Sequence, residues 1–285
     1  MCLRTFCRTG PHPHPAFPAF LINVWTGGGP CFKIPPSPLP WLSHIVTFFG
    51  LPTEIWAIIG LSLKISLVAV AIMMPPAFAL AWMLARWQFP FKLLVDALVH
   101  LPLVVPPVVT GWALLLLFGA NGPIGSFLAT HFGITLLFRW TGAAMAAAIM
   151  ALPLMVRAMR LSIEALDMGL EDAARTLGAS GTRLFLTVSL PLCIPGIVAA
   201  AILGFARSIG EFGATITFVS DIPGETRTLP IAIYSALQMP GGERMATSLA
   251  IISILLSIGA LMASEVLARR ANRGKASGGR ANHVL

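Results

Sequence analysis

Long apolar runs alternate with short polar islands along most of the chain. About 20 consecutive apolar residues are needed to cross the hydrocarbon core of a bilayer, and several runs reach that length. We expect transmembrane helices at about 56–85, 93–118, 141–162, 187–209 and 245–267. The pattern therefore predicts an all-α membrane protein, a polytopic helical bundle with about five transmembrane helices.

Prolines interrupt the first two runs. Pro75 and Pro76 lie within the first, and Pro102, Pro106 and Pro107 lie within the second. A proline frees a backbone carbonyl in a membrane helix, which is tolerated where neighbouring helices or water satisfy it. The breaks predict either a packed bundle that lines a cavity, with Pro106 and Pro107 beside the path, or kinks without a functional purpose.

The polar segment 164–191, between the third and fourth runs, predicts a short amphipathic helix. Its apolar stripe has the helical spacing i, i+3, i+4, i+7 and consists of Leu170, Ala173, Ala174 and Leu177. Asp167 can cap the start of this helix, and the carboxylates of Glu171 and Asp172 suit the positive end of the helix dipole. Gly178 stands where a left-handed residue would end it. Small side chains allow close approach, so the helix is suited to docking.

A motif with fixed spacing begins in this predicted helix and continues beyond it. The order acidic-Ala-Ala-x3-Gly-x9-Val-x-Leu-Pro begins at Asp172. It resembles the EAA loop of ABC importer permeases, with Asp172 in place of the usual Glu and Val188 in place of the usual Ile. In that family the loop is a cytoplasmic coupling helix that fits a cleft on the ATP-hydrolysing subunit. A plain amphipathic connector would explain the stripe, but not the interval. The resemblance assigns ATPase coupling to Glu171, Asp172, Ala173, Ala174, Gly178, Leu190 and Pro191.

A charged pair lies at the end of the fourth run. Arg207 and Glu211 are four residues apart, so they can pair on a helix. At membrane depth such a pair is either a structural bridge or part of a hydrophilic path. In the second case Arg207 would favour anions and Glu211 would hold it in place. Phe212 stands between Gly210 and Gly213 and is a candidate hydrophobic gate.

The surrounding sequence sharpens the resemblance. Segments 206–220, 222–230, 100–107 and 175–178 are similar to the permeases of molybdate importers, and the similarity covers about residues 54–270. Sulfate and tungstate permeases share the general pattern. The resemblance implies a type I ABC importer permease fold, a homodimer of permease chains, two ABC ATPase subunits and a periplasmic oxyanion-binding protein. ATP and Mg would be bound by the ATPase subunits, and no cofactor by this chain.

Composition also places the chain in a membrane. Of the 285 residues 56% are hydrophobic and 11% are charged, and the mean hydropathy is +0.84. Soluble domains carry about 25% charged residues. The formal net charge of +8 does not indicate a nucleic acid partner, because the charges lie in loops between the apolar runs and there is one Tyr.

Lysine and arginine are distributed unequally between the loops. If 164–191 is cytoplasmic, the cytoplasmic side collects Arg86, Lys92, Arg157, Arg160, Arg175, Arg183, Arg269, Arg270, Arg273, Lys275 and Arg280. The opposite side, leaving out the N-terminal tail, has Arg139, Arg227 and Arg244. By the positive-inside rule this predicts a multi-pass protein with a cytoplasmic C-terminus. The resemblance implies that the membrane is the bacterial cytoplasmic (inner) membrane.

Other functional classes lack the residues that they need. The chain has no G-x-x-x-x-G-K-[ST] phosphate loop, so a partner must hydrolyse ATP. A membrane enzyme needs paired carboxylates, a nucleophile beside a base or metal ligands, whereas His100 and Glu211 have no evident catalytic partner in the sequence. A secondary transporter would show two similar halves and ion-coupling acids at the midplane, and neither feature is visible in the sequence. We therefore expect a transport subunit without a catalytic or metal site.

The chain divides into three regions. Residues 1–50 are rich in proline and glycine, so we expect them to be disordered, or untranslated if the true start lies nearer Leu51. Residues 54–270 are expected to form the transmembrane domain of the importer. Residues 271–285 are expected to form a basic cytoplasmic tail.

Overall fold

The described part of the chain is built from helices. The computed structural model describes residues 53–278, so the predictions for 1–50 and for the last residues of the basic tail lie outside the described residues. The helices are α2 (Thr53–Arg86), α3 (Lys92–Val104), α4 (Pro107–Phe118), α5 (Pro123–Phe132), α6 (Trp140–Glu164), α7 (Met168–Thr176), α8 (Gly181–Leu184), α9 (Leu190–Ile209), α10 (Gly213–Val219), α11 (Leu229–Leu237) and α12 (Glu243–Gly278). A π-helical turn, Phe185–Ser189, joins α8 to α9. Between residues 53 and 278 no strand is formed, which confirms the all-α class.

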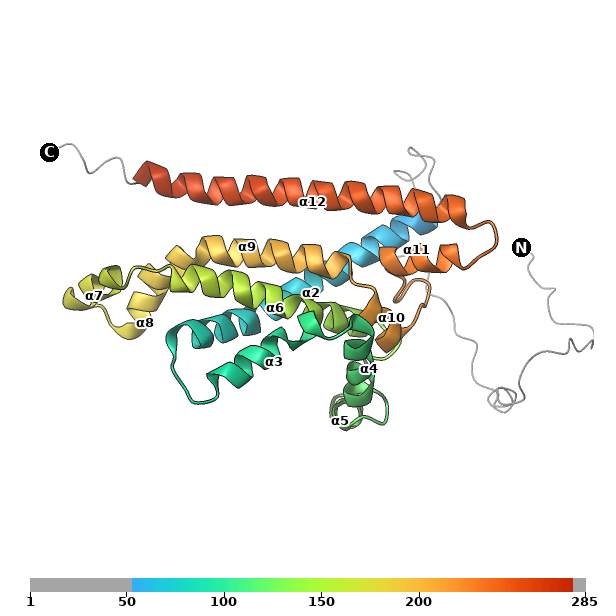
Figure 1. Ribbon diagram of the computed structural model, residues 1–285, viewed down its shortest axis with the longest axis horizontal. Helices are drawn as coiled ribbons and strands as arrows, with labels where there is room; N and C mark the ends of the chain where they lie inside the picture. The colour runs from blue at the N-terminus through green and yellow to red at the C-terminus, as the bar shows by residue number, and fades with distance from the viewer. Residues whose placement is uncertain (1–52, 279–285) are drawn as a thin grey trace, which may run out of the picture. The chain divides into compact units, whose positions relative to one another are not determined.

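Within these residues, four helices are long and apolar enough to cross a membrane. They are α2, α6, the continuous helix from α8 through α9, and the first half of α12, and a bent pair of helices makes a fifth candidate. Figure 1 shows α9 lying between α6 and α12, and α9 packs against both. This confirms the polytopic bundle and its four to five spans.

The predicted span 93–118 is not one straight helix. It consists of α3 and α4, which are bent by 115° at the break between them. Val105 is extended (φ −73°, ψ 137°), as expected for a residue whose α conformation is disfavoured by the following Pro106. Pro75 and Pro76 leave α2 continuous, so proline alone does not decide the break. The difference is that α4 turns to pack on α10.

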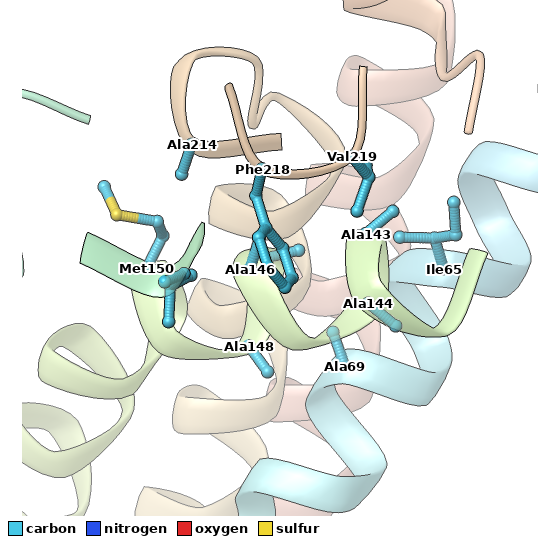
Figure 2. Packing of buried hydrophobic residues seen from close by; sticks show 12 residues of the cluster. Ile65, Ala69, Ala143, Ala144, Ala146, Ala148, Met150, Ala214, Phe218 and Val219 are labelled. Carbon is cyan, nitrogen blue, oxygen red and sulfur yellow. The ribbon is translucent and has the colours of Figure 1, made fainter. Parts of the chain in front are cut away.

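Helix α6 is the centre of the packing. It contacts α2 on one side and α9 on another, and 67% of its most apolar stretch is buried, against 11% for α12. Figure 2 shows Phe218 of α10 lying across α6 near Ala146, and Ile65 of α2 near Ala143. The small buried residues of α6 include Ala143, Ala144, Ala146 and Ala147. Such small residues allow helix backbones to approach closely in a membrane, where dispersion contacts drive association.

One serine fixes α11 against α2. Ser62 Oγ donates to the Ile58 carbonyl oxygen and accepts from the Leu229 N–H, both at 2.8 Å, and Ser62 is buried. In Figure 1, α10 and α11 lie at the end of the bundle opposite to α7 and α8. The two groups of candidate residues therefore occupy opposite ends of the helices that connect them.

Candidate functional site

The segment expected to dock on an ATPase does form a short helix. Helix α7 begins after Asp167, whose Oδ1 accepts from the Gly169 N–H at 2.8 Å and so caps it as predicted. Gly178 has φ +83°, in the left-handed region where a side chain is strained. The backbone thus turns away directly after α7, and the helix stands at one end of the bundle (Figure 1).

Helix α7 leaves much of its apolar stripe uncovered. Leu170 is 51% exposed and Leu177 is 89% exposed, and Ala173 between them is exposed as well. Asp172 is exposed and pairs with Arg175 at 3.2 Å. The stripe and its acidic neighbour therefore form a surface that the described residues of this chain do not cover.

Glu171 lies on the other side of the same helix. Its Oε1 accepts from Arg86 Nη2 at 2.6 Å and from Ser189 Oγ at 3.0 Å, and Glu171 and Ser189 are both buried. Leu190 and Pro191 follow directly as the first turn of α9. The two acidic residues that the sequence grouped together thus have different surroundings. From the sequence, Arg86 was counted among the charges of the cytoplasmic side but was not assigned to the coupling residues; its position in the last turn of α2 is the signal that was available.

At the opposite end, the predicted pair of Arg207 and Glu211 is formed. Arg207 Nη1 lies 2.5 Å from Glu211 Oε2, and the Glu211 side chain is 2% exposed against 24% for Arg207. Glu211 Oε1 also accepts from the Ala214 N–H at 2.9 Å, in the first turn of α10. A single buried carboxylate therefore joins the end of α9 to the start of α10 and leaves part of the guanidinium accessible.

The proline break and the glycine segment meet at this end. A Cβ on Gly213 would lie 2.8 Å from Pro107 Cβ, so the start of α10 is in contact with the start of α4. Pro106 immediately precedes α4 as its N-cap. The structure thus brings Gly213 against Pro107, which lies about a hundred residues earlier in the chain.

Phe212 and Gly210 complete this segment. The ring of Phe212 packs against Tyr234 of α11, with 5.0 Å between the ring centroids. Gly210 ends α9 at φ −91°, which other residues also adopt. Tyr234 did not stand out in the sequence, because an aromatic residue in an apolar stretch gives no signal of its partner. The candidate gate is therefore a pair of rings from two helices.

The loop between α10 and α11 is held by a second ion pair. Arg227 donates from Nε to Asp221 Oδ1 at 2.7 Å and from Nη2 to Oδ2 at 3.0 Å, and Ser235 Oγ donates to the same Oδ2. Burial by itself would raise the pKa of Asp221, but the hydrogen bonds from Arg227 and Ser235 outweigh it and lower the pKa. The loop is thereby fixed to α11.

Comparison with known proteins assigns the chain to a family. The family described as "binding-protein-dependent transport system inner membrane component" matches residues 65–273. The molybdenum transport system permease protein ModB of Escherichia coli K12 is 56% identical over 214 residues, which cover 75% of this chain and 93% of that protein. The sulfate transport system permease protein CysT of Salmonella typhimurium is 38% identical over 180 residues, 62% of this chain and 65% of that protein.

Solved structures agree on the fold. A chain from the crystal structure of a bacterial ABC transporter involved in the import of the acidic polysaccharide alginate superposes with a TM-score of 0.63 at 17% identity, covering 82% of this chain and 85% of that chain. At this identity the likeness concerns the fold alone, which is that of the type I ABC importer permeases. The chain belongs to the family of inner-membrane components of binding-protein-dependent transport systems.

Proposed function

We propose that this chain is the permease subunit of an ATP-driven importer that moves molybdate across the cytoplasmic membrane. The observation that carries the proposal is the 56% identity to a molybdenum permease over 93% of that protein's length. The similarity to a sulfate permease is lower and covers a smaller share of both chains, so sulfate is the second candidate and tungstate the third.

The exposed face of α7 is the proposed contact with the ATPase subunit. Leu170 and Leu177 offer apolar surface there, Ala173 leaves room for close approach, and Asp172 adds a charge at the rim. ATP and Mg belong to the ATPase subunits in this proposal. The proposed complex contains two copies of the chain and two ATPase subunits. In it, α7 and the C-terminus lie on the cytoplasmic side, as the distribution of Lys and Arg favours.

The opposite end receives the oxyanion from a periplasmic binding protein. Arg207 is partly accessible and offers a fixed positive charge to an anion, while Glu211 holds the guanidinium in one place. The packed rings of Phe212 and Tyr234 form the proposed gate beside it. Closure of the ATPase dimer would displace α7 and change the exposure of this end, as in other transporters that move rigid bodies around a site.

ATPase activity of the assembled complex tests the proposal. The chain is reconstituted in proteoliposomes with its ATPase subunit and binding protein, and the binding protein is loaded with molybdate or with sulfate. We expect stimulation by the molybdate-loaded protein alone. Stimulation only by the sulfate-loaded protein would mean that the imported oxyanion is sulfate. Uptake in liposomes that lack the ATPase subunit would mean that the chain is a secondary transporter.

A further inference from the structure

The buried carboxylate of α7 has no place in the docking surface described above. Glu171 is 6% exposed, and its Oε1 is the common acceptor for Arg86 of α2 and Ser189 of the π-helical turn. These three residues come from three elements of the chain, and the carboxylate is the point where the elements meet. Glu171 thus faces into its own chain, whereas Asp172 faces outward.

The groups around Arg86 hold its guanidinium beside the Glu171 carboxylate. Its side chain is 15% exposed and lies at the last residue of α2. The guanidinium carbon lies 5.4 Å from the centroid of the Trp82 ring, and another nitrogen contacts Met168 Sδ in the first turn of α7. Among the side chains that the structure describes, the Glu171 carboxylate is the one that forms an ion pair with Arg86. A buried charge without such a partner is strongly unfavourable, so the two residues hold each other.

The neighbouring ion pair on α7 is of another kind. Asp172 and Arg175 are 68% and 57% exposed, so water and salt screen their attraction, and the pair joins two residues of the same helix. Since Leu170 and Leu177 are exposed too, apolar packing holds α7 only loosely to the rest of the chain. The pair of Arg86 and Glu171 is therefore the strong connection between α7 and the long helices.

We propose that Glu171, Arg86 and Ser189 form a positioning link that transmits displacement of the docking helix α7 to α2 and α9. The inference rests on the proposed function of α7. Both α2 and α9 pack along α6 toward the end that carries Arg207 and Glu211, so a movement imposed at α7 reaches that end through two helices. Glu171 acts through Arg86 and does not itself contact the ATPase subunit.

The test measures how many ATP molecules are hydrolysed for each oxyanion imported. The reconstituted complex carries Glu171→Gln or Arg86→Gln, and Glu164→Gln serves as the matched control. Glu164 is also paired with an arginine at the same end of the bundle, at 2.7 Å from Arg160 Nε, but it takes no part in the link. We expect the ratio to rise about fivefold or more in the first two variants, the lower range of coupling between sites, and to stay unchanged in the control.

Two further variants keep the inference testable if a single substitution prevents assembly. Ser189→Ala removes one hydrogen bond from Glu171, and we expect a smaller rise of the ratio. The exchange Arg86→Glu with Glu171→Arg should bring the ratio back toward that of the natural chain, since coupling of two sites appears as non-additivity. A merely structural pair would lower the amount of complex and leave the ratio unchanged.

The outcomes separate this inference from the proposed function. If the natural complex shows no stimulation by any loaded binding protein, the proposed function fails. If the natural complex is stimulated while Glu171→Gln and Ser189→Ala assemble with an unchanged ratio of ATP to oxyanion, the link fails and the importer stands. An equal rise in Glu164→Gln would also overturn the link.

Discussion

Glu171 and Asp172 are neighbours in the chain, yet one is buried and the other is two-thirds exposed. The same contrast recurs at the far end, where Glu211 is buried and its partner Arg207 is partly accessible. In each case the buried carboxylate forms an ion pair with an arginine and accepts a hydrogen bond from a second group, which offsets the cost of removing it from water. At the residue scale, the fixed carboxylates position the chain and the accessible groups remain free to meet a partner.

Arg207 is expected to be essential for transport. We expect Arg207→Ala to lower oxyanion uptake about tenfold or more, because it removes the partly accessible cation proposed to meet the anion, and a hydrogen bond to a charged group contributes about 1.5–3 kcal/mol. Uptake by proteoliposomes, normalised to assembled complex, is the measurement.

The double variant separates the two roles of this pair. We expect Arg207→Ala with Glu211→Ala to remain impaired, because the cation is still missing although no buried carboxylate is left without its partner. Uptake restored by the second substitution would mean that the pair is a structural bridge and that Arg207 does not contact the anion.

Asp221 makes the loop between α10 and α11 sensitive to acid. Its pKa is lowered in the folded chain, so the contribution to stability is present above the ordinary carboxylate pKa and is lost as the pH falls through the lowered value. We expect the Asp221→Asn variant to melt about 2–4 °C lower at neutral pH, the shift that 1 kcal/mol gives in a chain of this size.

Melting of both proteins between pH 7 and pH 3 tests this prediction. The difference should shrink on acidification, as the natural carboxyl becomes protonated and loses its ion pair with Arg227. A difference that is the same at both ends of this range would show that Asp221 does not contribute through its charge.

At the element scale, close contacts between backbones decide where helices lie. A Cβ on Gly111 of α4 would lie 2.6 Å from the Ala214 carbonyl oxygen of α10, whereas Gly60 of α2 has nothing within 4 Å of the same position. The contact explains why α4 leaves the direction of α3. Gly111 and Gly60 thus both lie within helices, but only Gly111 faces the backbone of a neighbouring helix.

This pair of glycines permits a matched experiment. We expect Gly111→Ala to destabilise the folded chain, since two backbones must move apart, and we expect Gly60→Ala to leave it unchanged or stabilise it by up to about 1 kcal/mol, the difference in helix propensity. Thermal unfolding of the two purified variants measures this. Equal melting temperatures would show that α4 and α10 are not held at the distance described.

Gly178 ends α7 in a conformation that other residues seldom adopt. A β-branched side chain at φ +83° is strained, so Gly178→Val should shift the end of the docking helix and uncouple ATP hydrolysis from uptake. Insertion into the membrane should be unaffected, because the apolar spans are unchanged. Normal uptake per ATP in this variant would count against the role of α7 in coupling.

At the scale of the whole molecule, α6 is surrounded by protein while other helices expose apolar surface. Leu93 and Val104 of α3 are 82% and 84% exposed, and little of the apolar first half of α12 is buried. Such surface is suited to lipid or to another membrane chain, because neither requires hydrogen bonds from it. We expect the charged ends and the apolar flanks together to orient the chain in the membrane.

Labelling of introduced cysteines tests this orientation. In a chain whose own cysteines are replaced, Leu177→Cys beside α7 and Glu225→Cys in the loop before α11 are both at exposed positions. We expect a membrane-impermeant maleimide to label position 225 in cells with a permeabilised outer membrane and position 177 in inverted vesicles. The reverse pattern would invert the topology and remove α7 from the cytoplasmic side.

Sequence patterns alone were sufficient for the class, for the apolar spans other than 93–118 and for the short helix at 168–176, because these depend on the spacing of residues close together in the chain. The cap at Asp167, the turn at Gly178 and the pairing of Arg207 with Glu211 are local in the same sense. The motif intervals indicated the family for the same reason.

The tertiary structure decided what depends on residues far apart. It placed Glu171 against Arg86, Phe212 against Tyr234 and Gly213 against Pro107, and it turned α4 by 115° from α3. The spacing of residues along the chain does not predict these contacts, because the burial of a charge and the close approach of two backbones depend on which helices pack together. Local periodicity therefore defines the helices of this permease, while their packing defines which of its charges are held and which are offered to a partner.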